Sequence, residues 1–93
     1  MQGMRTFNFK SVYKKDLKRV SRRGYDLSRL AVVLDALRGG NSLEPSLRDH
    51  PLKGEWKTWR ECHIEADWLL IYKISDTEVL LARTGTHADL FGE

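Results

Sequence analysis

The sequence predicts an α+β fold in which helices cover one mostly antiparallel sheet. Two segments with helical periodicity occupy the first part of the chain, and strand-like alternation or continuous apolar runs fill the second part. A chain of 93 residues has room for one compact core and none for a large cofactor cavity. We therefore expect residues 1–93 to form a single domain.

The chain opens with a predicted strand and a predicted helix. Phenylalanines alternate with polar residues from Arg5 to Phe9, which indicates a short strand, placed at a sheet edge. Apolar residues then recur at helical spacing from Ser11 to Arg23, and Gly24 ends this helix.

A second helix is expected over residues 27–37, where leucines and alanines follow the i, i+3, i+4 pattern. Asp26 or Ser28 can cap it, and the glycine pair at 39–40 stops it. The two helices then form an antiparallel hairpin whose shared apolar side lies across the sheet.

The second half predicts a loop and a meander. Residues 41–54 hold both prolines and show no period, so they form a loop that carries His50. Three antiparallel strands are expected at Trp56–Ile64, Trp68–Ile74 and Val79–Thr84, with the middle strand buried.

The composition excludes several classes of protein. No apolar run approaches the roughly 20 residues that cross a bilayer, and the first five residues lead into no signal peptide, so we expect a cytoplasmic protein with no membrane association. Cys62 is the only cysteine, which excludes an internal disulfide and a cysteine-rich zinc site. We expect it to be buried as a small apolar residue.

Charge is distributed unevenly along the chain. Residues 1–38 carry ten Lys and Arg against three Asp and Glu, a net charge of +7, whereas residues 39–93 carry −4. A basic face of this kind favours an anionic partner, either phosphate or an acidic protein, although a solvated helix surface can have the same composition.

The three histidines, His50, His63 and His87, all lie in the second half. His63 ends one predicted strand and Asp67 begins the next, and the last strand returns to the same end of the sheet and delivers His87 there. Imidazole gives and takes protons near neutral pH. We therefore expect an acid–base cluster at one end of the sheet.

Two further residues extend this cluster. Arg83 adds a planar guanidinium suited to phosphate, and Phe91 offers a face on which a base can stack, although it suits equally a residue that pins the C-terminus to the core. Such a set suits RNA cleavage by attack of the 2′-OH, which requires no metal and no cofactor. A zinc site made by the three histidines and Asp67 is the competing use.

Specific motifs then identify a family. They are Asp49-His50-Pro51-Leu52, Gly54, Trp56-Lys57, Arg60, His63, Asp67-Trp68, Ile71-Tyr72-Lys73, Arg83-Thr84-Gly85-Thr86-His87 and Leu90-Phe91. With these residues the chain resembles the YafQ branch of the RelE-like bacterial toxins. The resemblance is dense over residues 49–92 and rests on pattern over the first forty.

The resemblance implies the compact RelE-like fold and a toxin of a type II toxin–antitoxin system. Such a toxin is a ribosome-dependent endoribonuclease, or mRNA interferase, that inhibits translation and is neutralised by a cognate antitoxin. Its partners would be the antitoxin, the ribosome and mRNA. Carried over by position, the acid–base cluster is His50, His63, Asp67 and His87, the phosphate-stabilising arginine is Arg83, and the aromatic residue important for activity is Phe91.

Individual roles stay hypotheses at this point. We expect His87 to be the general acid, with Asp67 or a histidine as the general base. An aspartate with an ordinary pKa near 3.9 is a weak base, so Asp67 can instead orient a histidine, and the sequence does not choose between these roles. A non-catalytic module that binds RNA or antitoxin and a metal-dependent hydrolase remain as alternatives.

The basic first helix gains a role within this interpretation. A toxin that works inside the ribosome needs sequence-independent contacts with ribosomal RNA phosphates. We expect these contacts from Lys14, Lys15, Lys18, Arg19, Arg22 and Arg23. The same surface suits acidic residues of an antitoxin.

Overall fold

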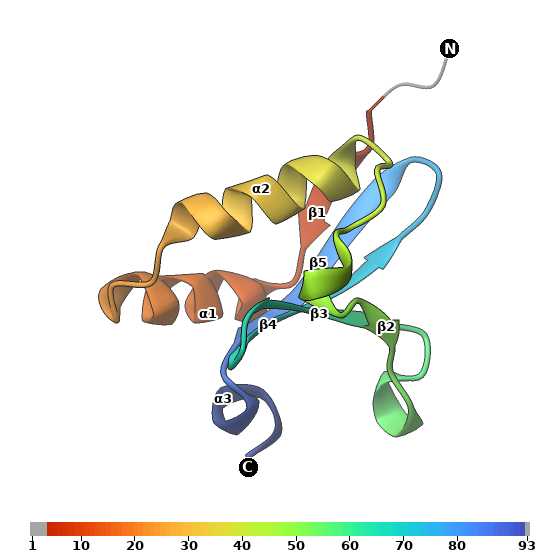
Figure 1. Ribbon diagram of the computed structural model, residues 1–93. Helices are drawn as coiled ribbons and strands as arrows, with labels where there is room; N and C mark the ends of the chain where they lie inside the picture. The colour runs from red at the N-terminus through yellow and green to blue at the C-terminus, as the bar shows by residue number, and fades with distance from the viewer. Residues whose placement is uncertain (1–3, 93) are drawn as a thin grey trace.

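The computed structural model describes residues 4–92, built around one five-stranded sheet in the order β1-β5-β4-β3-β2 (Figure 1). β1 lies parallel to β5, and the other neighbouring pairs are antiparallel. The strands are β1 (Thr6–Phe9), β2 (His50–Pro51), β3 (Arg60–Glu65), β4 (Trp68–Ile74) and β5 (Glu78–Gly85). The predicted α+β class, the edge position of the first strand and the meander are confirmed.

The predicted helical hairpin is also confirmed. Helices α1 (Ser11–Arg22) and α2 (Leu27–Arg38) lie against one face of the sheet (Figure 1). Asp26 is the cap of α2, since its carboxylate accepts the backbone N–H of Ser28 at 3.0 Å. Within residues 4–92, no helix is long and apolar enough to cross a membrane.

Strand β4 is the centre of the core because it is buried on both faces. Trp68, Leu70 and Tyr72 face the helices, while Leu69 and Ile71 face the opposite side. All five are at most 1% exposed, which accounts for the uninterrupted apolar run in the sequence.

A smaller core covers the second face of the sheet. Its residues come from the sheet, from a 3₁₀ turn η2 (Gly54–Trp56) and from a C-terminal helix α3 (His87–Phe91) that the sequence pattern did not predict. They are Trp59, Leu69, Ile71, Ala82 and Leu90, with Leu52, Trp56, Leu80 and Phe91 packed against them. The sheet is therefore covered on both faces.

The predicted strand Trp56–Ile64 begins later than expected, at Arg60. The backbone N–H of Trp59 instead donates to the carbonyl of Trp56 at 2.8 Å, which closes a turn. Residues three apart in such a turn lie on the same side, so the two indole rings meet edge to face with centroids 6.0 Å apart. In the sequence, large side chains interspersed with polar ones in this segment resembled the alternation of a strand, which is why the predicted strand began too early.

The predicted loop 41–54 contains a 3₁₀ turn, η1 (Pro45–Leu47), and the two-residue strand β2. Asp49 anchors it: the carboxylate accepts the Tyr72 hydroxyl and the guanidinium of Arg60, at 3.3 and 3.1 Å from Nε and Nη2. These contacts hold the loop against Arg60 of β3 and Tyr72 of β4.

A buried carboxylate joins α1 to the edge of β5. The ladder between β1 and β5 stops at Leu81, so the backbone of β5 beyond that point has no strand on its outer side. Asp16, 1% exposed, accepts the backbone N–H of Thr84 at 3.2 Å and two N–H groups of Arg83, from Nε at 2.7 Å and Nη2 at 3.1 Å. One side chain therefore replaces the missing strand.

Replacing Asp16 by Ala will leave the Thr84 N–H and the Arg83 guanidinium without their acceptor. We expect the free energy of unfolding, measured by urea denaturation, to fall by about 3 kcal/mol, as for loss of one partner of a buried ion pair. Asp35→Ala, which removes an exposed carboxylate of α2, is the matched control and should cost far less. Equal losses in the two variants would contradict the role given to Asp16.

Candidate functional site

The structure brings the three histidines together although they come from β2, β3 and α3. The rings of His50 and His63 are stacked, with centroids 5.9 Å apart and planes inclined by 30°. The ring of His87 lies 6.0 Å from that of His63. His63 is therefore the middle member of a row of three imidazoles.

The strand period explains how β3 contributes. Cys62 and Ile64 point into the main core, so Glu61 and His63 point to the opposite face. His50 is the ladder partner of Glu61, which places its ring beside this pair. Cys62 is buried, as expected.

Glu61 is a member of the site that the sequence reasoning missed. Its carboxylate is buried, with Oε2 at 3.1 Å from His50 Nε2 and 3.7 Å from His63 Nε2, while Oε1 has no partner among the described residues. The signal in the sequence was its position two residues before His63, hence on the same face of the strand. A buried carboxylate of this kind can accept a hydrogen bond from a protonated ring nitrogen of either histidine.

Arg48 is a second missed residue, and it orients both neighbouring rings. Its backbone is in the left-handed region, with φ of 47°, and its carbonyl lies 2.8 Å from His50 Nδ1. Its Nη2 lies 3.5 Å from His63 Nδ1. Because arginine only donates, this contact requires a lone pair on Nδ1 of His63.

His50 has an acceptor at each ring nitrogen, the carbonyl of Arg48 and the carboxylate of Glu61. Both contacts are hydrogen bonds only when both nitrogens carry a proton. His50 is thus arranged as a proton donor or a fixed positive charge.

Asp67 holds His87 in place. Its Oδ1 accepts the backbone N–H of His87 at 2.9 Å and lies 2.6 Å from the ring Nδ1. The hydrogen bond from the His87 backbone, and after it the one from the His87 ring, lowers the pKa of the Asp67 carboxyl below its ordinary value. With Nδ1 engaged, Nε2 of His87 is the nitrogen left to exchange a proton with a substrate.

Arg83 is less available than the sequence suggested. Two of its N–H groups are bound by Asp16, whose hydrogen bonds raise the pKa of the guanidinium, and the side chain is 19% exposed. Three N–H groups remain for another partner, since arginine has five donors. Phe91 packs against the second core, in the manner of a residue that pins the C-terminus.

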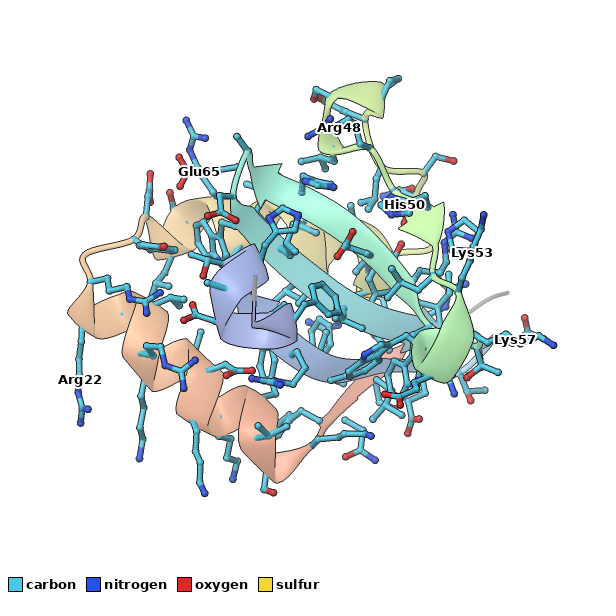
Figure 2. All side chains as sticks on the ribbon, turned by 90° about the horizontal axis from the view of Figure 1, so that it is seen from below. Arg22, Arg48, His50, Lys53, Lys57 and Glu65 are labelled. Atoms are coloured by element: carbon cyan, nitrogen blue, oxygen red, sulfur yellow. The ribbon has the colours of Figure 1, made fainter. Side chains whose placement is uncertain are left out.

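The expected basic surface of α1 divides into two groups. Lys14, Lys15, Lys18 and Arg22 are exposed, and Arg22 projects away from the body of the protein (Figure 2). Arg19 and Arg23 instead form ion pairs: Arg19 lies 3.5 Å from Asp16 and 3.7 Å from Asp89, and Arg23 lies 2.6 Å from Asp89.

A further basic group lies beside the histidines. Arg48, His50, Lys53 and Lys57 follow one another along the same side of the molecule (Figure 2). Sequence reasoning missed it, because the lysines are spread over an irregular loop with no periodicity. It gives the histidine end a positive surface suited to phosphates.

Three ligand atoms of the site are arranged as a metal could use them. One ligand atom each from His50, Glu61 and His63 lie within 4.8 Å of one another, and imidazole with carboxylate suits divalent transition metals. This trio differs from the zinc site that the sequence suggested as an alternative, because it contains Glu61 in place of His87 and Asp67.

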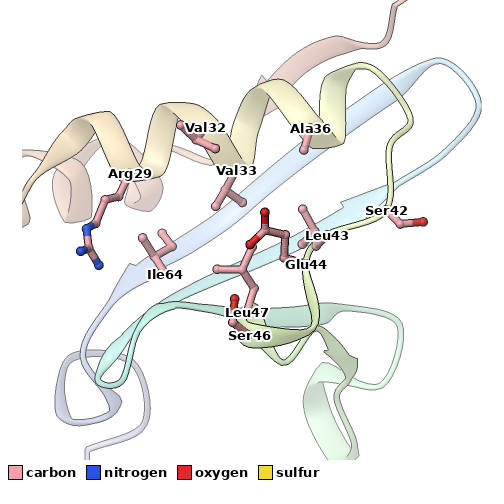
Figure 3. Close-up of a pocket in the computed structure, with 10 residues that line it drawn as sticks. All are labelled: Arg29, Val32, Val33, Ala36, Ser42, Leu43, Glu44, Ser46, Leu47 and Ile64. Carbon is pink, nitrogen blue, oxygen red and sulfur yellow. The ribbon is translucent and has the colours of Figure 1, made fainter.

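A separate apolar cavity of about 440 Å³ lies between α2 and η1 (Figure 3). Among its lining residues are Val32, Val33, Leu43, Leu47 and Ile64, and Val32 is 70% exposed. Ile64 belongs to the core face of β3, so the cavity and the histidines lie on opposite faces of the sheet.

Comparisons with known proteins agree over nearly the whole chain. Residues 5–92 match the family model described as a bacterial toxin of type II toxin-antitoxin system, YafQ. The chain is 40% identical over 89 residues to mRNA interferase toxin YafQ of Escherichia coli K12, across 95% of this chain and 97% of that protein.

Solved structures give the same result. The E. coli DinJ-YafQ toxin-antitoxin complex contains a chain with a TM-score of 0.88 and 40% identity, covering 99% of this chain and 100% of that one. A copper-bound mutant toxin from Helicobacter pylori has a TM-score of 0.89 and 42% identity, covering 95% and 100%.

The contacts of Asp67 give a prediction about its titration. His87→Ala removes the ring but keeps the backbone N–H, so the pKa of Asp67 should rise in this variant and still stay below the ordinary value of about 3.9. A ¹³C NMR titration of the carboxyl group measures this, with the urea-unfolded protein as reference.

The sign of the linked stability follows from the direction of this shift. A carboxyl whose folded-state pKa is lowered stabilises the fold above the unfolded pKa, and this contribution is lost as pH falls through the folded value. An Asp67 that titrates at its unfolded value in His87→Ala would rule out the backbone hydrogen bond.

Proposed function

Because this chain belongs to the YafQ family of bacterial toxins, we propose that it is an mRNA interferase of a type II toxin–antitoxin system, cleaving mRNA on the ribosome and so inhibiting translation. The observation that carries this proposal is the row of three imidazoles ending at His87, whose Nδ1 is held by Asp67. Nucleases that use 2′-OH attack need an acid and a base on opposite sides of one phosphodiester.

His87 is the general acid in this mechanism. Asp67 engages Nδ1, stabilises the imidazolium and leaves Nε2 to protonate the departing 5′ oxygen. The short helix α3 supports the arrangement, because the Asp67 contact reaches both the ring and the backbone of the same residue. Asp67 is then an orienting residue and not the base.

His63 is the general base. The donor group of Arg48 faces its Nδ1, so the ring carries a lone pair there, and this nitrogen takes the 2′-OH proton once the Arg48 guanidinium has turned to the phosphate. Its ring lies 6.0 Å from that of His87, a spacing at which both can reach oxygens of one phosphodiester. His50, with acceptors at both nitrogens, lies beside the base and can donate a hydrogen bond there.

Arginine side chains stabilise the negative charge that develops on the phosphorane. Arg83 keeps three N–H groups for a phosphate oxygen after its pair with Asp16, and Arg48 adds a second guanidinium at the histidine row. The partly buried Phe91 offers one ring face to a nucleobase near this end. The scheme uses no cofactor.

Partners follow from the same proposal. The relative from E. coli was solved with the antitoxin DinJ, and we propose a cognate antitoxin for this chain too. In this proposal ribosomal RNA meets the exposed lysines and Arg22 of α1, and the protein works in the cytoplasm, where ribosomes are found.

A metal-binding role is the second candidate, because a relative is described as copper-bound and because His50, Glu61 and His63 form a ligand trio. A metal ion held there would bind His63 and so block the proposed general base. A metal-dependent hydrolase would be inactivated by chelators, whereas the acid–base mechanism is unaffected by them. A non-catalytic RNA- or antitoxin-binding module would leave mRNA intact.

The cleavage test uses programmed ribosomes with excess toxin. We expect 2′,3′-cyclic phosphate ends, no loss of rate with 1,10-phenanthroline, which removes transition metals and leaves the Mg²⁺ of the ribosome in place, and a fall of about 10²- to 10⁴-fold in the single-turnover rate for His87→Ala, as for loss of a general acid. Asp35→Asn, on the exposed side of α2, is the control. A wild-type rate for His87→Ala, or a rate abolished by 1,10-phenanthroline, would refute the mechanism.

The basic face of α1 is tested separately. Changing Lys14, Lys15, Lys18 and Arg22 together to Gln should weaken ribosome binding and lower the slope of log affinity against log salt by roughly one for each lost phosphate contact. Arg38→Gln on α2 is the single-site control for a change in net charge. An unchanged salt slope in the fourfold variant would exclude this surface from the ribosome contact.

A further inference from the structure

The position of His87 depends on a helix that is too short to be stable on its own. α3 spans five residues, His87–Phe91, far fewer than an isolated helix needs to be stable in water. Something outside the helix must therefore fix its orientation. The inference that follows rests on the proposed nuclease function, because it concerns the alignment of His87.

Asp89 ties α3 to α1, in addition to the packing of Leu90 in the second core and the Asp67 contacts of His87. Inside the helix it completes a capping box: its backbone N–H donates to Thr86 Oγ1 at 3.0 Å, and its carboxylate accepts the Thr86 backbone N–H at 3.0 Å. Outside the helix the same carboxylate accepts two N–H groups of Arg23, at 2.6 and 3.0 Å. These hydrogen bonds hold the pKa of Asp89 well below its ordinary range.

The approach of Asp89 to the backbone is close. Gly85 has a φ of 151°, and a Cβ placed on it would lie 2.8 Å from Asp89 Oδ2. Only glycine leaves room for the carboxylate at this distance. The chain is therefore built to seat Asp89 between the end of β5 and α1.

We propose that the Arg23–Asp89 pair is a clamp that positions His87 for catalysis by fixing α3 against the C-terminal end of α1. The clamp acts at the third residue of α3, and Asp67 acts at the first. Arg23 and Asp89 are positioning residues and do not touch the substrate. Two anchors at neighbouring points fix both the place of His87 and the direction of its ring.

The energetics separate this role from one in overall stability. The Arg23 side chain is 40% exposed and that of Asp89 is 11% exposed, and an ion pair whose cation is open to solvent adds little to the stability of a fold. A displacement of a catalytic group by about 1 Å, in contrast, can cost about a hundredfold in rate. The clamp should therefore show itself in the rate of cleavage and not in the unfolding temperature.

The experiment measures single-turnover cleavage on programmed ribosomes and ribosome affinity for Arg23→Ala, Asp89→Asn and the double variant. Arg23→Ala lowers the net charge and Asp89→Asn raises it, so an electrostatic effect on ribosome binding has opposite signs in the two. We expect both to lower the rate at saturation by about 10- to 100-fold, and the double variant to be no slower than either. Arg23→Lys should recover part of the rate.

Arg38→Ala is the matched control, since it removes the same charge from an exposed position at the end of α2, outside the surfaces assigned to RNA. It should keep the wild-type rate at saturation. If Arg23→Ala changes affinity alone, or if Asp89→Asn cleaves at the wild-type rate, the clamp does not exist. Circular dichroism should give unfolding temperatures within a few degrees of wild type; a global loss of fold in Arg23→Lys also overturns the proposal.

A readout without cleavage keeps the clamp apart from the proposed function. The Leu90 amide donates within α3, to the carbonyl of Thr86 at 3.1 Å. Its hydrogen-exchange protection should fall in Arg23→Ala and stay unchanged in Arg38→Ala. Unchanged protection overturns the clamp, whereas failure of the wild type to cleave mRNA on the ribosome overturns the nuclease function.

Discussion

Strand β5 loses its outer neighbour after Leu81, because β1 ends two residues before α1 begins, and the carboxylate of Asp16 takes over at that point. It satisfies a backbone N–H of β5 and binds the guanidinium of Arg83. The cost of burying a charge is offset by these hydrogen bonds. Since β5 leads directly into α3, everything that follows it in the chain, His87 included, depends on this edge being closed.

The site that results is divided into two electrostatic halves. Asp67 serves His87 on one side, and the buried Glu61 serves His50 and His63 on the other. An acid and a base that shared one carboxylate would compete for the same proton. Separate carboxylates, one exposed at the helix start and one buried under the strand, give the rings different surroundings and therefore different tasks.

Sequence periodicity was sufficient for the elements that carry it. The helix α2 and strand β4 follow from the spacing of their apolar residues, and the meander follows from the order of the strands. The meander in turn was enough to bring His63, Asp67 and His87 to one end. Helix α3 was not predicted, because five residues are too short for a period to be recognised.

Other parts of the site depend on contacts between distant residues and leave no local pattern. Glu61 became visible only when His50 was found opposite it in the ladder, which requires the register of a two-residue strand. The pair of Arg83 with Asp16 joins residues 67 positions apart. The composition of α1 likewise could not show which of its basic residues form ion pairs with other residues of the protein.

That division of α1 has a consequence for how the toxin can meet RNA. Four basic side chains point to solvent, while Arg19 and Arg23 turn toward Asp16 and Asp89. A phosphate that drew Arg23 away would have to replace a bidentate contact with a carboxylate that also caps α3. Contacts with RNA are therefore favoured at the solvent-facing lysines and Arg22, where they cost no internal bond. In the proposed function this side of α1 binds ribosomal RNA, and in the proposed clamp its other side keeps His87 aligned.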